Sequence, residues 1–475
     1  MQGWVHMTVI YRFRSMDNLL HEYNELEEQE LVLSSPRYFN DPLEGYQDVF
    51  WEGDEVLWEN LLRHYLLNLH RAVTICSLAD NDEDLDEYAI EPKLTRDDLS
   101  SDEYRQQFDA ICQSFFEEKG FGRISSSLSS LPKPLKRNNL QQILSYIHPS
   151  ALESVLEEMR DSGTISDFPN FTNSLDSESV EDTLEALSTM MDNGNEELLE
   201  SVSSQFGPLK SHTHLRQAVQ SGVEQLELHH KKQHLLHNSF PRRYIREITN
   251  SLIHTNWHTL CFATECASPP MWATYADEHK GAALMFRADR QTDDSWGEMT
   301  VNGRTGQGSS GPIFGDITAS LHEVDYGSPP PEVDFFRFIG TLPLPKLESA
   351  WHSTPDGNTS QMIDEVFEDP DAWREELWEH FRSMSTRKLG QWEHEQEVRM
   401  VLPDLLGSEG SHRKVTYDMS QLEGVVFGLR TKLEDRFEVI RILSEMNQGD
   451  DSLPVEFYQM VFDGNEFKKV KLDIF

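Results

Sequence analysis

The sequence predicts an α+β protein in which a small mixed or antiparallel sheet is interrupted by a mostly helical insertion. Short segments rich in β-branched and aromatic residues occur towards both ends of the 475-residue chain, whereas the middle has apolar residues at helical spacing. The composition shifts at about Ala79, where an acidic run begins. Because this length allows two or three domains, we divide the chain into 8–84 and 246–475, two parts of one core, and 85–245, the insertion.

The first core segment is expected to form strand, helix and strand. Residues 8–14 alternate in character and are rich in β formers, which places Arg12 and Arg14 on the same face of a strand. Ser15 is a suitable N-cap for a short helix that follows. Residues 31–35 predict a second strand, and 39–45 carry the residue types of turns.

The insertion and the second core segment are read from the same patterns. In the insertion, apolar residues at helical spacing predict a helix with Pro149 near its start and Gly163 after its end, and a second helix over 180–191. A loop rich in glycine and serine is expected over 291–313. The remaining core elements are helices over 270–279 and 371–389 and strands over 259–264, 282–286, 398–402, 424–428 and 455–460.

Charge and hydropathy exclude several classes of protein. The chain has 83 acidic and 41 basic residues and a formal net charge of -42, which argues against strong binding to nucleic acid or to anionic lipid. No run of about 18 apolar residues exists, so no membrane span is expected. The first ten residues lack the features of a signal peptide, and four cysteines are too few for a disulfide scaffold, so we expect a cytoplasmic protein.

The most informative block runs from Trp392 to Pro403. Glu395 and Glu397 lie two apart at the expected entry of a strand, so both carboxylates are predicted to point to one side. A crowded pair of carboxylates splits its pKa values and provides an acid and a base, and anionic carboxylates stabilise an oxocarbenium ion. The alternative is an acidic sheet edge in a very acidic protein.

Two further blocks suggest ligand binding. Arg12 and Arg14 are suited to hold a phosphate or carboxylate, or else they form structural ion pairs. Trp272, Tyr275 and His279 share one face of the expected helix, where they can stack on a nicotinamide or adenine ring or pack in the core. The G-x-G-x-x-G pattern of 306–311 has no strand before it and no helix after it, so it is a weak dinucleotide signal.

Several of these blocks together resemble the bacterial family called domain of unknown function 2971. The resemblance rests on spaced motifs in the family's order: Tyr11 to Ser15, Leu33 to Pro36 with Phe39 to Pro42, Cys261-Phe262, Met271-Trp272, Tyr275-Ala276, His279 to Gly281, the W-x-x-E-x-E-x-R block of Trp392, Glu395, Glu397 and Arg399, and Gly424 to Gly428. The long insertion departs from the family's compact pattern.

The order of an arginine on a first strand, a hydroxyl residue on a middle strand and E-x-E at a late strand also resembles the ADP-ribosyltransferase pattern. The resemblance implies NAD as the substrate, with Arg12 or Arg14 on its phosphates and Thr264 shaping the nicotinamide pocket. It gives Glu397 the role of orienting the nicotinamide ribose and Glu395 that of activating the acceptor. The remaining candidate contacts with NAD are Asn40, Trp272, Tyr275 and His279. The full Ser-Thr-Ser motif of that pattern is missing, since Ala263-Thr264-Glu265 stands in its place.

Three functions are therefore expected in decreasing order. The first is an NAD-cleaving enzyme or ADP-ribosyltransferase, acting as an effector or toxin. The second is a non-catalytic sensor or adaptor in a phage-defence type of system, which binds a protein partner through the helical insertion. The third is a metal-dependent nuclease built from Asp41, Glu44, Glu395 and Glu397, which the acidic charge disfavours.

Overall fold

The computed structural model describes residues 6–79, 89–165, 228–290, 296–404, 413–446 and 454–473, together with Glu178, Asp182 and Glu185. The chain divides into two compact units. Unit 1 comprises Met1–Tyr46, Asn256–Pro331 and Phe381–Phe475, and unit 2 comprises Gln47–Thr255 and Glu332–His380. The acidic run after Ala79 and the helix expected over 180–191 lie outside the described residues, apart from isolated positions.

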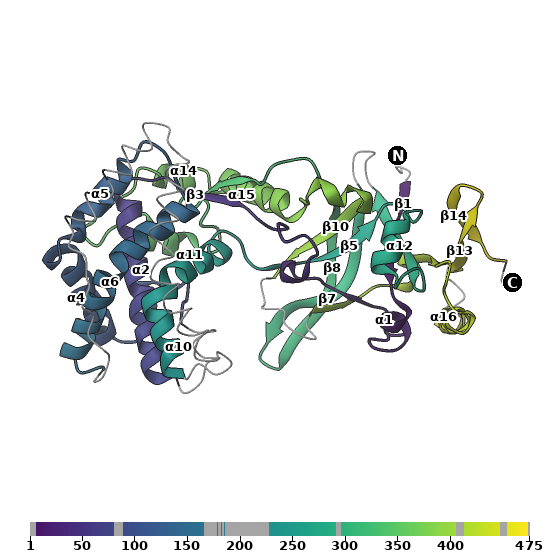
Figure 1. Ribbon diagram of the computed structural model, residues 1–475, viewed down its shortest axis with the longest axis horizontal. Coiled ribbons are helices and arrows are strands. Elements are labelled where there is room, and N and C mark those ends of the chain that lie inside the picture. Colours follow the sequence, from purple (N-terminus) through teal and green to yellow (C-terminus); the bar gives the residue numbers. More distant parts are fainter. Residues whose placement is uncertain are drawn as a thin grey trace, which may run out of the picture. The chain divides into compact units, whose positions relative to one another are not determined.

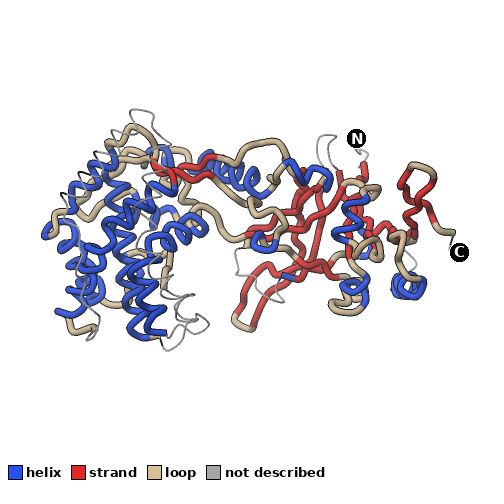
Figure 2. The backbone as a smooth tube through the Cα atoms, in the orientation of Figure 1, coloured by secondary structure: helices blue, strands red, loops and turns tan. Residues whose placement is uncertain are grey.

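Unit 1 is built on an eleven-stranded mixed sheet in the order β14-β13-β12-β6-β1-β5-β10-β8-β7-β11-β2 (Figures 1 and 2). Its strands are β1 (His6–Arg14), β2 (Glu30–Val32), β5 (Trp257–Ala263), β6 (Ala282–Arg290), β7 (Glu298–Gly308), β8 (Gly311–Glu323), β10 (Glu397–Pro403), β11 (Lys414–Thr416), β12 (Leu422–Phe427), β13 (Glu456–Asp463) and β14 (Glu466–Lys471). β12 and β13 pair in parallel through the crossover helix α16 (Leu433–Met446), as a parallel pair requires.

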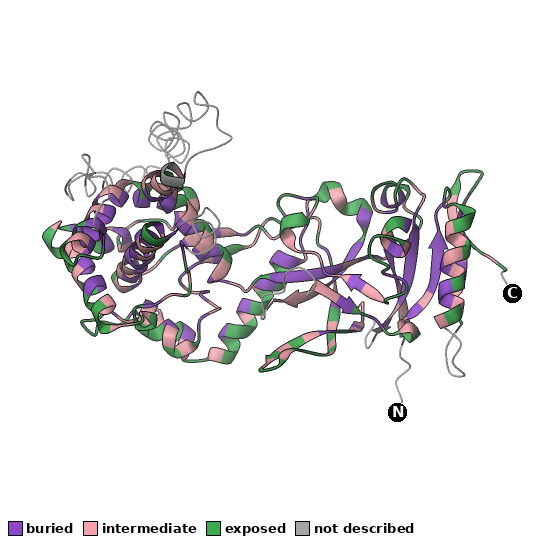
Figure 3. Ribbon diagram, turned by 90° about the horizontal axis from the view of Figure 1, so that it is seen from below, coloured by how far each residue is buried: buried purple, intermediate pink, exposed green. Residues whose placement is uncertain are grey.

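Each face of this sheet carries its own apolar cluster, and Figure 3 shows the central strands as mostly buried. Ile10 of β1 belongs to the larger cluster, which includes residues of α1 (Met16–Leu20) and α16. Tyr11 and Phe13 belong to the opposite cluster, together with Trp272 of α12 (Pro269–Tyr275). The alternation of β1 therefore places Arg12 on the same face as Ile10.

The architecture is α+β, as the sequence predicts, but the sheet is large rather than small. Part of the difference comes from the loop expected over residues 291–313. Residues 291–295 lie outside the described part of the chain, and from Glu298 onwards β7 and β8 form a long hairpin. The hairpin is stabilised by cross-strand polar pairs such as Thr300 with Thr318, whose hydroxyls are 2.7 Å apart. The outer part of the hairpin has few buried residues. Its glycine-rich sequence therefore lacks the alternation of apolar and polar residues from which a strand is predicted.

Unit 2 is mainly helical, with a small three-stranded sheet in the order β4-β3-β9. Its central helix is α2 (Glu55–Leu78), of whose 24 residues 15 are buried, which is the pattern of a helix surrounded by others. Among the described residues, the other α-helices and strands that lie wholly in this unit are α4 (Asp102–Gln113), α5 (Ile124–Ser129), α6 (Arg137–Asp161), α10 (Leu228–His234), α11 (Phe240–Ser251), α13 (Leu344–Trp351), α14 (Ile363–Phe367), β3 (Asp48–Trp51), β4 (Leu135–Lys136) and β9 (Glu332–Asp334).

The boundaries of unit 2 differ from those of the insertion expected from the sequence. The unit starts at Gln47 rather than at residue 85, because α2 packs with α5, α6 and α11. A second segment, Glu332–His380, adds β9 and α13 to it. The chain therefore crosses between the units four times, and α15 (Pro370–Ser385) contains the last crossing.

Three predicted helix boundaries are wrong. The helix predicted over 371–389 is α15, which ends at Ser385. Pro149 lies inside α6, which begins at Arg137, because buried residues such as Leu140 and Leu152 pack on both sides of the proline. The helix predicted over 270–279 ends at Tyr275, as discussed below. No helix in the described part of the chain has the length and apolar character needed to cross a bilayer.

Candidate functional site

A cavity of about 230 Å³ opens in unit 1 where two neighbouring strands separate. β1 pairs with β6 along nine residues but with β5 at the single pair Tyr11 and Ala263. The charged and amide side chains on its wall are Arg12, Arg14, Asn40, Glu44, Lys388, Glu395, Glu397 and Arg399, and its aromatic residues are Tyr11, Phe13, Tyr38, Phe39, Phe262 and Tyr275. The strand separation thus brings the expected arginines and the expected glutamates to one cavity.

Arg12 is a buried cation without an acidic partner among the described residues. Its guanidinium donates to the backbone carbonyls of Cys261 (3.3 Å) and Val32 (2.9 Å), and its Nε has no hydrogen-bond partner. Burial, with a smaller contribution from Arg14, lowers the pKa of Arg12 to about 10, so the side chain is still charged at neutral pH. A buried guanidinium that lines a cavity and has an N–H group without an acceptor is suited to bind an anion.

Arg14 is in a different state, because Glu25 already neutralises it. Its Nε donates to Glu25 Oε2 over 2.6 Å, and its Nη2 donates to the other carboxylate oxygen. Glu25 is buried, whereas Arg14 is half-buried. The structural ion pair considered for the two arginines therefore applies to Arg14, and Arg12 is the one available for a ligand.

The two glutamates of the E-x-E motif converge, although they do not both lie on a strand. Glu395 ends a short 3-10 helix (Gly390–Glu395), and Glu397 begins β10. Between them, Gln396 has a left-handed backbone with φ of 44°, a conformation unfavourable for a residue other than glycine. This kink, rather than strand alternation, directs both carboxylates to the amino group of Lys388.

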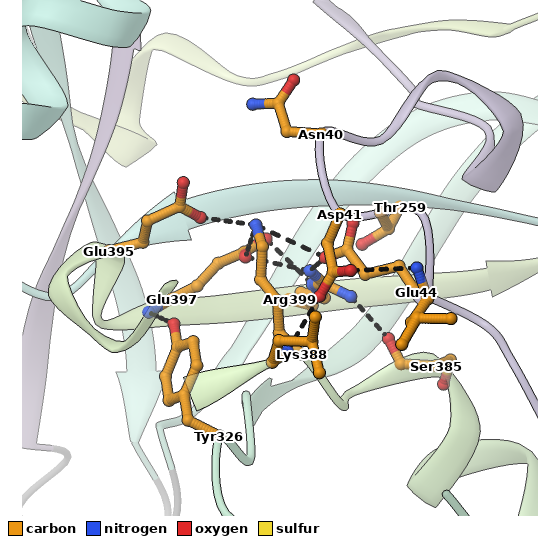
Figure 4. A network of polar contacts seen from close by, with 12 residues as sticks. Asn40, Asp41, Glu44, Thr259, Tyr326, Ser385, Lys388, Glu395, Glu397 and Arg399 are labelled. Carbon is orange, nitrogen blue, oxygen red and sulfur yellow. Dashed lines mark hydrogen bonds and ion pairs between the residues drawn. The ribbon is translucent and has the colours of Figure 1, made fainter. Parts of the chain in front are cut away.

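Lys388 and Arg399 organise the acidic side of the cavity (Figure 4). The Nζ of Lys388 lies 2.5 Å from Glu395 Oε2 and 3.4 Å from both Glu397 Oε2 and Glu44 Oε1. Arg399 binds both carboxylate oxygens of Glu397, at 2.8 and 2.9 Å, and also donates to Glu44. Two cations therefore serve three buried carboxylates in one network.

The network shifts the pKa values of its members in opposite directions. Burial alone would raise the pKa of Glu397, but Arg399 and then Lys388 lower it to about 2. Burial would lower the pKa of Lys388, but the carboxylates of Glu397, Glu44 and Glu395 raise it above its usual value. For Glu44, burial outweighs Arg399 and Lys388, so its pKa is raised. Glu397 is thus a fixed anion at every physiological pH.

Glu395 has a second, neutral partner at the mouth of the network. Tyr275 Oη donates to Glu395 Oε1 over 2.6 Å, and Asn40 Nδ2 donates to Tyr275 Oη over 2.7 Å. Burial, together with the hydrogen bond to Glu395, raises the pKa of Tyr275, so the phenol keeps its proton. The chain Asn40–Tyr275–Glu395 therefore reaches from an exposed amide to the buried carboxylate.

Three expected binding residues do not line this cavity. Trp272 is completely buried, and its Nε1 donates to the Cys266 carbonyl while its ring packs edge-on against Phe13. Thr264 contributes a backbone N–H to the Gln396 carbonyl (2.9 Å). The ring of His279 packs against Phe467 at 5.9 Å. In this arrangement Trp272 is a core residue and cannot stack on a ligand.

The position of His279 corrects the helical face proposed from the sequence. After Tyr275 the chain turns through Asp277, Glu278 and His279, which all have positive φ angles between 44° and 71°. Three consecutive left-handed residues end the helix, so His279 does not lie one turn beyond Tyr275. Nothing in the local sequence signals this turn, because none of the three residues is a glycine.

Lys388, Glu44 and Asp41 are central residues that the sequence did not identify as a single site. Asp41 accepts backbone N–H groups from Leu43 and Leu389, at 2.9 and 2.8 Å, and so ties the 39–45 turn to the segment that carries Lys388. The only chemical role predicted for Asp41 and Glu44 from the sequence is that of metal ligands in a nuclease. In the described residues no group of three or more His, Cys, Asp or Glu side chains is arranged to hold a metal ion, and Lys388 occupies the centre of the three glutamates.

Comparison with known proteins adds no relative: no protein-family model, no curated protein and no solved structure matches the chain. The family resemblances therefore rest on the quoted motifs alone.

Proposed function

We propose that the cavity of unit 1 binds part of NAD and that the chain is an NAD-cleaving enzyme of the ADP-ribosyltransferase type. The observation that carries the proposal is the meeting of the unpaired Arg12 with the carboxylates of Glu395 and Glu397 on one cavity wall. The motif resemblances to the ADP-ribosyltransferase pattern and to the domain of unknown function 2971 family supplied the expectation of NAD.

Arg12 is the proposed phosphate ligand. It forms no ion pair with a described residue and donates to two backbone carbonyls, whereas Arg14 is paired directly with Glu25, whose charge acts on Arg12 only from a distance. A hydrogen bond to a charged group contributes about 1.5–3 kcal/mol, more than a neutral one, and an ionised phosphate oxygen would supply the missing negative charge.

The cavity is smaller than a complete dinucleotide requires. Its volume of about 230 Å³ lies below the range of roughly 300–1,000 Å³ that is typical of sites for drug-sized ligands. We therefore propose that it encloses one nucleotide half of NAD, with the ring near Tyr275 or Tyr38, and that the other half lies outside.

The carboxylate that contacts the ribose in the proposed reaction must be able to change its hydrogen bonds. In the proposed reaction the bond between the ribose anomeric carbon and the nicotinamide nitrogen breaks, and the electron pair leaves with nicotinamide. Water or another acceptor adds to the ribose cation and loses a proton to a base. Arg399 holds both oxygens of Glu397 through one guanidinium. Glu395 is held by two separate groups, Lys388 at Oε2 and the neutral phenol of Tyr275 at Oε1, and Tyr275 can be displaced without leaving a charge unpaired. We therefore assign the contact with the ribose cation and the proton to Glu395. Glu397 then positions Lys388 and the backbone of β10.

The test is release of nicotinamide from NAD by the purified chain. Glu395→Gln is expected to lower the rate by about 10²–10³, the usual effect of removing a preorganised electrostatic group. Glu393→Gln is the matched control, because Glu393 is exposed and lies in the same short helix. Absence of nicotinamide release by the wild-type chain, with and without candidate acceptors, would contradict the proposal.

A sensor or adaptor function is the second candidate, and one observation favours it. Unit 2 has its own large apolar core, and none of its described residues lines the cavity of unit 1. It is therefore available as the surface for a protein partner. Cross-links from a copurified partner that map to unit 2 would support this candidate, and cross-links confined to unit 1 would contradict it.

A further inference from the structure

We propose that a second cavity, wholly within unit 2, binds an uncharged planar heteroaromatic molecule with an exocyclic N–H donor, of nucleobase or nucleoside size. The cavity has a volume of about 700 Å³, within the range of roughly 300–1,000 Å³ found for small-molecule sites. All described residues that line it belong to unit 2, so the inference is independent of the proposed NAD chemistry.

The cavity is formed by regular elements rather than by loops alone. Asn60, Arg63, His64 and Leu67 of α2 line it, and their spacing of three and four residues places them on one face of the helix. Phe108 and Cys112 of α4 form part of the same wall, and residues 349–355, at and after the end of α13, close another side. Such a framework holds its side chains in fixed positions.

Asn60 supplies a preorganised hydrogen-bond acceptor. Its Nδ2 donates to the backbone carbonyls of Trp351 (2.8 Å) and Ser353 (3.1 Å), so both amide hydrogens are used. The side-chain oxygen has no hydrogen bond to a described residue and is the group that remains for a ligand. An amide oxygen fixed in this way selects a ligand with an N–H donor.

The charged and aromatic residues argue for an uncharged, flat ligand. Arg63 is neutralised by Glu59, with contacts of 2.8 and 2.7 Å, and its guanidinium lies 5.1 Å from the ring centre of Phe116. Arg96 is neutralised by Asp109 through two hydrogen bonds. Both cations already have partners, and the other charged residues of the wall, Asp97, Asp109 and Glu117, are acidic, so the wall does not attract an anion. The attraction for a flat ligand then comes from aromatic and apolar surface, which every heteroaromatic base can use.

His64 lines the cavity but has no ring nitrogen available to bind the ligand. Its Nδ1 accepts from Tyr244 Oη (2.8 Å), and its Nε2 faces the Pro92 carbonyl (3.0 Å), so both ring nitrogens are occupied. Burial lowers its pKa to about 4, so at neutral pH it adds no positive charge to the wall. The charge of the wall therefore comes from its arginine, aspartate and glutamate side chains and not from His64.

Calorimetric titration of the full chain with adenosine, cytidine, guanosine and nicotinamide tests the proposal. At least one of these probes is expected to bind. Where adenosine binds, N6,N6-dimethyladenosine, which keeps the ring but lacks the exocyclic N–H donor, should bind about tenfold more weakly, as loss of one hydrogen bond implies. Absence of binding by all four probes, or equal binding of the two adenosines, would overturn the proposal.

Variants locate the site. Truncating Asn60 could unfold the unit, so the test variant is Ser353→Phe, which fills the cavity while leaving the Ser353 carbonyl in place. It is expected to abolish binding. Ser145→Phe, on an exposed position of α6, and Arg12→Gln, in unit 1, are expected to leave binding unchanged. Binding that survives Ser353→Phe, or that is lost in Arg12→Gln, would show that the ligand does not occupy this cavity.

Discussion

Arg399 and Glu397 form a two-point ion pair in the interior of unit 1, with Nε 2.8 Å from Oε1 and Nη2 2.9 Å from Oε2. Arg399 is 1% exposed and Glu397 is 5% exposed, so water does not compensate either charge. The Arg399 guanidinium also donates to the Ser385 carbonyl over 2.9 Å, which links the pair to the end of α15. The pair therefore serves as a structural support for the cavity wall.

Glu397→Gln is expected to destabilise the protein as well as to affect activity. Removing one member of a buried ion pair leaves the other charge uncompensated and costs about 3–5 kcal/mol. Glu44 still contacts Arg399, so we expect the lower end of that range in the free energy of unfolding, measured by urea denaturation. The exposed substitution Glu393→Gln should change nothing measurable. A loss below about 1 kcal/mol for Glu397→Gln would show that the pair is not structural.

The sequence identified part of the candidate site for a simple physical reason. Arg12 lies on a strand whose alternation is visible locally, and Glu395 and Glu397 are neighbours in one motif. Lys388 and Glu44 contact each other although they lie 344 positions apart in the sequence, and no local sequence pattern indicates such a contact.

The fold was predictable to a similar extent. The strands of the core were visible where β formers alternate, as in residues 8–14 and 398–402. The β7–β8 hairpin was not visible, because its glycines interrupt the pattern. The start of unit 2 could not be predicted either. It depends on the packing of α2 against helices far along the chain, and no sequence pattern at Gln47 indicates that packing.

Gly281→Ala is expected to be far more damaging than alanine at a glycine with open surroundings. A Cβ at Gly281 would lie 2.1 Å from the backbone oxygen of Arg14, and backbone at this position cannot move aside easily. We expect a loss of about 3 kcal/mol or more in the free energy of unfolding, as for severe overpacking. Gly464→Ala is the control: its φ of +65° costs about 1–2 kcal/mol, but nothing lies within 4 Å of the new Cβ. Equal losses for the two variants, measured by urea denaturation, would contradict this account.

Arg12 and Arg14 are expected to differ in their effect on ligand binding. Arg12→Gln removes the unpaired cation, so affinity for ADP-ribose should fall by about tenfold to a hundredfold, the value of one charged hydrogen bond. Arg14→Gln removes a cation that Glu25 already neutralises, so its effect on affinity should be several times smaller. Isothermal titration calorimetry distinguishes the two, after thermal unfolding has shown that both variants are folded. An equal loss in both would mean that Arg14 also faces the phosphate.

The helical unit is expected to lose stability as the pH falls below about 6.5. In His148, Nε2 faces the Leu236 carbonyl, which can only accept, so Nε2 carries the proton and Nδ1 accepts from Tyr65 Oη at 2.7 Å. His64 has the same arrangement, with the Pro92 carbonyl and the Tyr244 hydroxyl.

Burial lowers the pKa of both imidazoles to about 4, whereas in the unfolded chain they titrate near 6.5. The unfolded state therefore binds more protons between these values, and the stability that is fully present above pH 6.5 is lost as the pH falls towards 4. The loss amounts to roughly 3 kcal/mol for each histidine. Circular dichroism at 222 nm should show a lower melting temperature at pH 5 than at pH 7.5, and His148→Gln should reduce this difference, since glutamine does not titrate. A melting temperature that is the same at both pH values would contradict the assignment of neutral buried histidines.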